Sequence, residues 1–258
     1  MRRFLVLVYG VSCYLIFFGT FLYLIGFLGN FAVPKAIDDG AVAPLLPALL
    51  LDLGLVALFG IQHSVMARPA FKQRWTRIVP RSVERSTYVL VTSLILISIF
   101  WLWQPLPQTV WRAEAPWLAG LLTTLFFTGF LITLLSTYMT DHFDLFGLRQ
   151  VWLRFVRRPY EYPPFKVSWF YRLIRHPLYS GLILAFWATP HMTVGHLLFA
   201  AGMTSYILIA VRFEEQDLVS FLGDRYRDYQ REVPMLVPRP GRTYRPVDAG
   251  ERAPSGMR

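Results

Sequence analysis

The sequence predicts an all-α integral membrane protein with about six transmembrane helices, the last two forming a tight hairpin, and a cytoplasmic C-terminal cap. Two observations carry this prediction: long apolar segments recur along the chain, and the segments between them alternate between many and few basic residues. Hydrophobic residues make up 55% of the chain and charged residues 16%, and the mean hydropathy is +0.41. This composition excludes a soluble globular domain.

Four apolar runs have the roughly 20 residues that a spanning helix needs, at residues 4–28, 45–66, 87–106 and 117–138. The first run ends in Gly29 and Asn30 rather than at a small-residue cleavage site, so we expect a retained span and not a signal peptide. A further pair, 178–189 and 194–212, is separated by a break at Pro190. Its first member is short for a full span, which predicts a helical hairpin.

The distribution of basic residues among the connecting loops tests this assignment of spans. The connection 67–86 holds six basic residues against one acidic residue, and the connection 139–176 holds seven against three. The loops after the first and third spans, and the break at Pro190, carry only Lys35 and Arg112. By the positive-inside rule this predicts a bacterial inner-membrane protein with both termini in the cytoplasm. The net charge of +10 then indicates contact with lipid headgroups, and we expect no nucleic acid.

Metal and disulfide chemistry are not expected. Cys13 is the only cysteine, which excludes an internal disulfide and a cysteine metal cluster. His191 and His196 flank the outer break, far from the cytoplasmic polar residues. Asp52 is an intramembrane carboxylate near the outer end of the second span, where it either has a function or reaches the interface.

Ionisable and aromatic residues gather at the entrance and exit of the hairpin, and they are Arg175, His176, Tyr179, Glu214 and Glu215. A tight hairpin returns its exit to the side of its entrance, so we expect His176 and Glu215 to be neighbours. Such a pocket suits a zwitterionic ligand with a positive centre, and Gly181 would let the ligand approach the backbone. The alternative is that these groups are the solvated ends of two helices.

These residues also carry a resemblance. Residues 175–181 read RHPLYSG, Glu214-Glu215 follows, and Tyr226 and Tyr229 follow Gly223. This RHPxYxG, EE and GxxYxxY pattern resembles the membrane methyltransferases related to isoprenylcysteine carboxyl methyltransferase and phospholipid methyltransferases. The resemblance implies an S-adenosylmethionine site, with S-adenosylhomocysteine as product, formed by Arg175, His176, Tyr179, Gly181, Glu214, Glu215, Tyr226 and Tyr229.

Upstream motifs narrow the resemblance. QHSVMARP at 62–69, ERSTY at 84–88, HFDLFGLRQ at 142–150 and FWATPHMTVGH at 186–196 together resemble the bacterial methanethiol S-methyltransferases, which make dimethyl sulfide from methanethiol and S-adenosylmethionine. The resemblance covers most of the chain, and it implies methylation of methanethiol or a similarly small thiol. Asp141, Ser180 and His191 depart from the family's usual residues, which bears on substrate and rate more than on reaction class.

Thiol methylation calls for a group that helps to form the thiolate, the better nucleophile. His142 and Asp144 are the first candidates, because a histidine oriented by a carboxylate is a credible general base. The alternative is an interfacial turn in which Asp144 caps the following helix. His63, on the second span at the same membrane face, is the third candidate, and there a structural hydrogen bond competes with proton transfer as the explanation.

The expected organisation has three parts: a transmembrane half at 1–138, a cofactor-binding catalytic half at 139–240 and a disordered tail at 241–258. One alternative function changes the acceptor to a prenylated cysteine carboxylate or a lipid amine, which requires a wide lateral opening between helices. The other is a non-enzymatic membrane protein related to the nitrite/nitric-oxide-associated family, or a transporter. The expected partners are a small thiol and membrane lipids, with no obligate protein partner.

Overall fold

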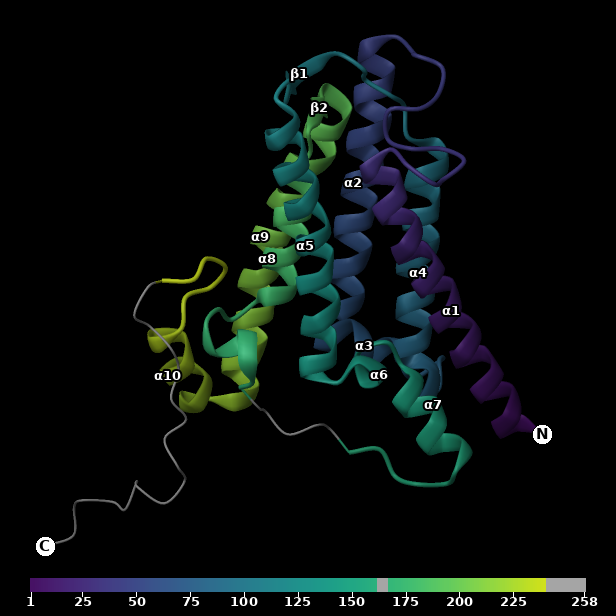
Figure 1. Ribbon diagram of the computed structural model, residues 1–258. Helices are drawn as coiled ribbons and strands as arrows, with labels where there is room; N and C mark the ends of the chain where they lie inside the picture. Colours follow the sequence, from purple (N-terminus) through teal and green to yellow (C-terminus); the bar gives the residue numbers. More distant parts are fainter. Residues whose placement is uncertain (162–166, 240–258) are drawn as a thin grey trace, which may run out of the picture.

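The computed structural model describes residues 1–161 and 167–239, and these residues are mostly helical (Figure 1). The elements in chain order are α1 (Arg2–Gly29), α2 (Leu45–Ala67), α3 (Pro69–Trp75), α4 (Arg81–Leu102), β1 (Thr109–Arg112), α5 (Pro116–Thr140), α6 (His142–Leu145), α7 (Leu148–Phe155), a 3-10 helix (Trp169–Arg172), α8 (Pro177–Trp187), β2 (His191–Thr193), α9 (Val194–Leu222) and α10 (Asp224–Glu232). The predicted all-α membrane class is confirmed, and the tail at 241–258 lies outside the described residues.

Within the described ranges, five helices are long and apolar enough to cross a membrane: α1, α2, α4, α5 and α9. α8 has 11 residues. It therefore rises about 16 Å, roughly half of a 30 Å hydrocarbon core. The predicted hairpin is present, because α8 packs against α9 and β2 joins them. The sequence predicted about six transmembrane helices. The described residues contain five helices that are long enough to span and one, α8, of about half that length.

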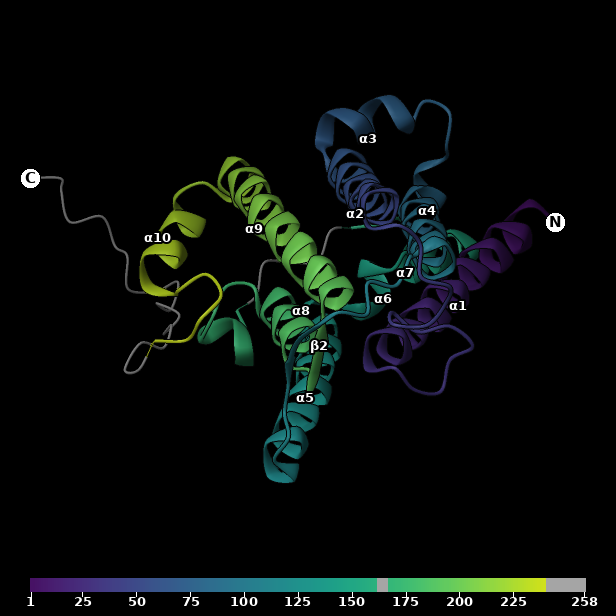
Figure 2. The ribbon, with the colours of Figure 1, turned by 90° about the horizontal axis from the view of Figure 1, so that it is seen from above.

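The helices pack in two groups (Figure 2). α1 lies against α4 and α7, and α2 lies against α4, whereas α5 lies along α8, which packs on α9. Contact between α2 and α9 joins the groups. Buried side chains from α1, α2, α4, α5, α8 and α9 form one core cluster that runs through both groups. The division at residue 138 stays a prediction.

Close packing of α5 on α8 depends on two glycines. A Cβ on Gly181 would lie 2.5 Å from the Gly129 carbonyl oxygen and 2.6 Å from the Thr133 hydroxyl oxygen. Small residues let two helix backbones approach this closely inside a membrane. Gly181 therefore faces α5, and close approach of a ligand to the backbone at this glycine stays a prediction that its position does not favour.

The two ends of the helix bundle differ. β1 and β2 pair antiparallel at one end, which we call the sheet end, and the N-terminus, α3, α6, α7 and α10 lie at the other, the α3 end (Figure 1). At the sheet end Asp52 is fully buried and accepts a hydrogen bond from the Gln104 backbone N–H (2.9 Å), so it does not reach the interface. His196 Nε2 donates to the Phe186 carbonyl (2.9 Å). The described residues contain no cluster of three or more residues that could hold a metal ion.

Candidate functional site

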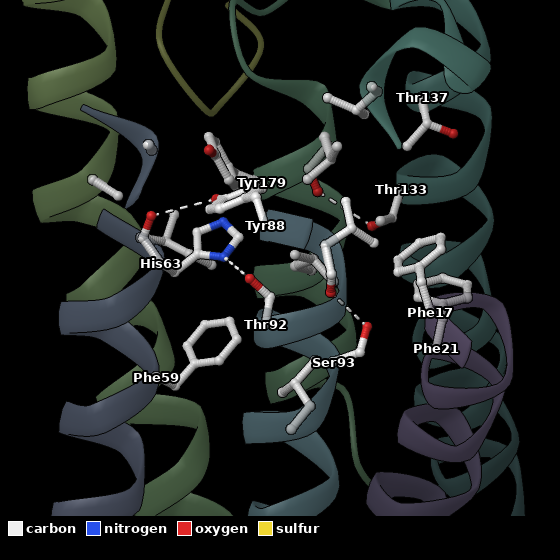
Figure 3. A pocket seen from close by; sticks show the side chains of 18 of the residues that line it. Phe17, Phe21, Phe59, His63, Tyr88, Thr92, Ser93, Thr133, Thr137 and Tyr179 are labelled. Carbon is white, nitrogen blue, oxygen red and sulfur yellow. Dashed lines mark hydrogen bonds between the residues drawn. The ribbon is translucent and has the colours of Figure 1, made fainter. Parts of the chain in front are cut away.

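A cavity of about 440 Å³ lies between the two helix groups (Figure 3). At the α3 end its wall carries five charged residues, which we call the charged mouth: Arg68, Lys72, Arg85, Glu214 and Asp217. Toward the sheet end its wall is apolar, with Leu24, Leu96, Phe186 and Phe199. Along α9, Glu214 and Phe199 are separated by a helix rise of about 22 Å. The cavity therefore leads from a charged opening to an apolar interior.

The charged mouth carries both signs of charge. Arg68 forms a salt bridge with Asp217 (3.0 Å), which connects the end of α2 to α9. Arg85 donates to the Leu145 carbonyl (2.6 Å) and lies over the Tyr88 ring. Burial lowers the pKa of Lys72, and the positive charge of Arg85 lowers it further. A mouth of this kind can bind a ligand that is itself both cationic and anionic.

Two of the eight predicted cofactor residues line the cavity. They are Tyr179 on α8 and Glu214 on α9, and the Tyr179 hydroxyl donates to Glu214 Oε2 (2.9 Å). This bond holds the carboxylate at the edge of the mouth. Glu214 can there accept hydrogen bonds from a cationic or hydroxylated ligand.

The neighbouring Glu215 lies outside the cavity wall, in a cluster that we call the Arg175 cluster: Arg175, His176, Glu215 and Gln230. Glu215 accepts two hydrogen bonds from the Arg175 guanidinium (2.6 and 3.1 Å), one from His176 Nε2 (2.9 Å) and one from Gln230 (3.0 Å). The expected proximity of His176 and Glu215 is confirmed. Backbone bonds from Arg175 and His176 to the carbonyls of Pro234 and Met235 tie the segment after α10 to the same place. The Arg175 cluster thus holds together the start of α8, α9, and α10 with the segment that follows it.

Tyr226 and Tyr229 also lie away from the cavity. Both are buried and pack with Val233 in a small hydrophobic cluster between α9 and α10. The Tyr229 hydroxyl donates to the Tyr171 carbonyl (2.6 Å). These tyrosines hold α10 against the rest of the chain, so a direct contact with the cofactor stays a prediction that their position does not favour.

His142 lines the cavity, but each of its two ring nitrogens is hydrogen-bonded to a hydroxyl group. The Thr137 hydroxyl donates to the Leu134 carbonyl (2.6 Å), so it accepts a bond from His142 Nδ1–H (2.7 Å). His142 Nε2 then accepts from the Tyr14 hydroxyl (2.8 Å). Burial lowers the pKa of His142, against an opposing effect of Asp141, and the ring is therefore neutral near pH 7. These bonds tie α1 to the end of α5.

Asp144 does not orient His142, so that expectation is wrong. Its carboxylate accepts hydrogen bonds from Tyr160 (3.1 Å), Gln150 (3.3 Å) and Arg149 (3.4 Å). The alternative, in which Asp144 caps the next helix, is also wrong, because α7 begins after Gly147 without a side-chain cap. The capping carboxylate is Asp141, which accepts from the Asp144 N–H at the start of α6 (3.1 Å).

His63 stands in the cavity wall beside Phe59 and Tyr88 (Figure 3). The Thr92 hydroxyl is directed at Gln62 Oε1 (3.4 Å), which leaves its oxygen to accept from His63 Nδ1–H (3.3 Å). In this tautomer the lone pair is on Nε2, the nitrogen that can take a proton. Of the three predicted proton acceptors, His63 is the one that the geometry favours.

Residues 50–237 match the family model described as NnrU protein. The chain belongs to the NnrU family. A protein of Mycobacterium tuberculosis named methanethiol S-methyltransferase is 49% identical over 242 residues, which cover 94% of this NnrU family member and 99% of the relative. Methanethiol S-methyltransferase 2 of Bradyrhizobium diazoefficiens is 51% identical over 239 residues, 92% and 91% of the two chains. Nurim of Xenopus laevis is 30% identical over 201 residues, 72% and 69%.

The predicted relation to the methanethiol S-methyltransferases is confirmed by these identities. No solved structure matches the chain. Sequence reasoning missed most of the cavity wall of this NnrU family member. Arg85, Tyr88 and Thr92 follow each other at helical spacing on α4 and all line the cavity, and that periodicity is the signal that would have found them.

Proposed function

We propose that this NnrU family member transfers a methyl group from S-adenosylmethionine to methanethiol and so forms dimethyl sulfide. The observation that carries the proposal is the cavity, with its charged mouth and apolar interior. It occurs in a chain that is about half identical to proteins named methanethiol S-methyltransferase over more than nine-tenths of its length. A charged donor and a small apolar acceptor each find a matching part of this cavity.

The cavity fits the methyl donor. S-adenosylmethionine is a zwitterion with a sulfonium centre, and a cavity of about 440 Å³ lies in the range of roughly 300–1,000 Å³ typical of ligand sites. Glu214 would bind its ammonium group or ribose diol, and Arg68 and Lys72 its carboxylate. The rings of Tyr88 and Tyr206 would lie against the positive centre. When bound, the donor supplies an electrophilic methyl group.

The protein's own groups then align the acceptor and remove its proton. The apolar wall takes up methanethiol and excludes water, which strengthens electrostatic interactions inside the cavity. His63 Nε2 accepts the thiol proton while the thiol sulfur bonds to the methyl carbon, and the breaking carbon–sulfur bond leaves its electron pair on the donor sulfur. General-base help of this kind contributes about 10²- to 10⁴-fold.

A small acceptor is favoured over a lipid or prenyl acceptor. The apolar end of the cavity is closed by Phe186 and Phe199, which are 1% and 0% exposed. A prenyl or acyl chain that extends toward the sheet end would meet these rings. The α3 end faces the cytoplasm in this proposal, because it carries the basic connections and because the donor is made there.

The acceptor is tested with purified protein, labelled S-adenosylmethionine and a panel of methanethiol, a prenylcysteine and phosphatidylethanolamine. We expect headspace dimethyl sulfide and the highest specificity constant for methanethiol. Label in the prenylcysteine or the lipid instead would favour the other methyltransferases, and no transfer to any acceptor would favour the non-enzymatic alternative. Single cysteines at Arg77 and Arg154 in a Cys13→Ala background test the orientation: a membrane-impermeant maleimide should label them only from the cytoplasmic side.

A further inference from the structure

The geometry of the transfer fixes on which side of the donor the acceptor lies. In an in-line displacement the attacking sulfur approaches from the side of the methyl carbon opposite the leaving sulfur. With the donor held at the charged mouth, the thiol sulfur lies on the sheet-end side of the methyl group, and its alkyl group, which stands roughly at right angles to the line of attack, lies among the apolar side chains there. This inference rests on the proposed function and concerns what the alkyl group meets there.

Phe59 is the first aromatic side chain on that path. It precedes His63 by one turn of α2, about 6 Å along the axis toward the sheet end. Its ring stacks on His63 at a centroid distance of 5.3 Å with 16° between the ring planes, and it meets Tyr206 edge-on at 5.5 Å. It is buried and lines the cavity (Figure 3). Phe59 therefore lies between His63 and the apolar end of the cavity, where we place the alkyl group of the thiol.

Two further rings close the path beyond Phe59. Phe186 on α8 and Phe199 on α9 pack edge-to-face at 5.4 Å and 87°. Phe199 is braced from behind by Trp103 (5.7 Å) and Phe27 (6.4 Å). Rings held on several sides cannot turn away to admit a longer chain, because densely packed interiors do not deform continuously.

We propose that Phe59, Phe186 and Phe199 form an aromatic floor that sets the upper size limit of the acceptor, with Phe59 in contact with its alkyl group. A straight-chain thiol that is longer than the space in front of these rings must then displace one of them. The reaction itself is unchanged: the same sulfur–carbon bond forms, and the same proton passes to His63. Methanethiol is accepted because its single carbon fits against the floor without displacing a ring.

The test compares specificity constants for methanethiol, ethanethiol and butanethiol in Phe59→Ala and in the wild type. We expect the ratio of the butanethiol to the methanethiol constant to rise about tenfold or more in Phe59→Ala, since a methylene in an apolar pocket is worth about 10- to 200-fold. Phe59→Leu keeps more of the packing and should raise the ratio less. It replaces Phe59→Ala in the test if the alanine variant does not fold.

Phe126→Ala is the matched control. Phe126 is as buried as Phe59, at 4% against 7% exposure, but it does not line this cavity. Its replacement should lower stability without changing the ratio. An unchanged ratio in both Phe59 variants, or an equal rise in Phe126→Ala, overturns the aromatic floor. A wild type that makes no dimethyl sulfide refutes the proposed function instead, so the two failures are distinguishable.

Discussion

Replacing Glu214 and Glu215 one at a time separates the cavity from the Arg175 cluster. The two carboxylates are adjacent in the chain, yet successive residues of a helix point about 100° apart. Glu214 lines the cavity, where its one side-chain partner is Tyr179 among the described contacts, and Glu215 bonds to three side chains in the Arg175 cluster. We expect Glu214→Ala to weaken donor binding and Glu215→Ala to weaken folding.

The size of each effect follows from the hydrogen bonds that the substitution removes. Glu215 and Arg175 are 13% and 11% exposed, so Glu215→Ala leaves a buried guanidinium without its counter-ion. Breaking a buried pair in this way costs about 3–5 kcal/mol, which lowers Tm by about 6 to 20 °C for a chain of this size. Glu214→Ala removes one hydrogen bond to Tyr179, about 1 kcal/mol. Loss of its charged hydrogen bonds to the donor, about 1.5–3 kcal/mol, raises the donor Kd by about 10- to 150-fold.

Thermal unfolding in detergent measures the first effect, and titration calorimetry with S-adenosylhomocysteine measures the second. Donor affinity of Glu215→Ala is measured below its own Tm, so that unfolding does not mimic lost binding. If Glu214→Ala binds the ligand normally, or if a folded Glu215→Ala fails to bind it while keeping the wild-type Tm, the donor sits on the Arg175 cluster and the reasoning is refuted.

Three further predictions concern packing, pH and proton transfer. Gly181→Ala should lower Tm by several degrees because its Cβ would overlap α5, whereas Gly120→Ala, with nothing within 4 Å, should not; equal shifts would contradict the α5–α8 contact. Because the pKa of His142 is lowered in the folded state, unfolding takes up a proton below about pH 6.5, and stability should fall as pH drops from 7 to 5.5. His142→Gln should flatten that decline, which unfolding curves at several pH values measure; a slope equal to that of the wild type would contradict it. His63→Gln should lower turnover about 10²- to 10⁴-fold near pH 7, with a smaller loss at alkaline pH where solution supplies thiolate; a loss that is the same at every pH would make His63 structural.

The sequence predicted what local patterns determine. Apolar runs and alternating basic loops predicted the membrane helices, and the tight hairpin predicted that His176 lies near Glu215. It could not predict which of two adjacent glutamates faces the cavity, because the helix rotation of α9 is set by packing against α2 and α8. His142 and Asp144 failed as a pair for the same reason: their side chains leave one helical turn toward different partners.

The cavity wall was also beyond local patterns. Its residues come from α1, α2, α4, α5, α8 and α9 and from the short α3 and α6, and the motifs that contain some of them do not show that they face one cavity. Only the tertiary arrangement of α2 against α4 and α9 brings His63, Thr92 and Tyr206 to one place. Gly181 illustrates the opposite case. It belongs to the RHPxYxG motif, from which a ligand contact was expected, but it packs against α5.

The most direct test of the central claim is an experimental structure with bound S-adenosylhomocysteine. We expect the ligand in the cavity, with its carboxylate at Arg68 and Lys72, its ribose or ammonium group on Glu214 and its sulfur on the His63 side. A ligand seated instead on Arg175, His176 and Glu215, with the cavity left to lipid or solvent, would contradict the claim that methyl transfer takes place between the two helix groups.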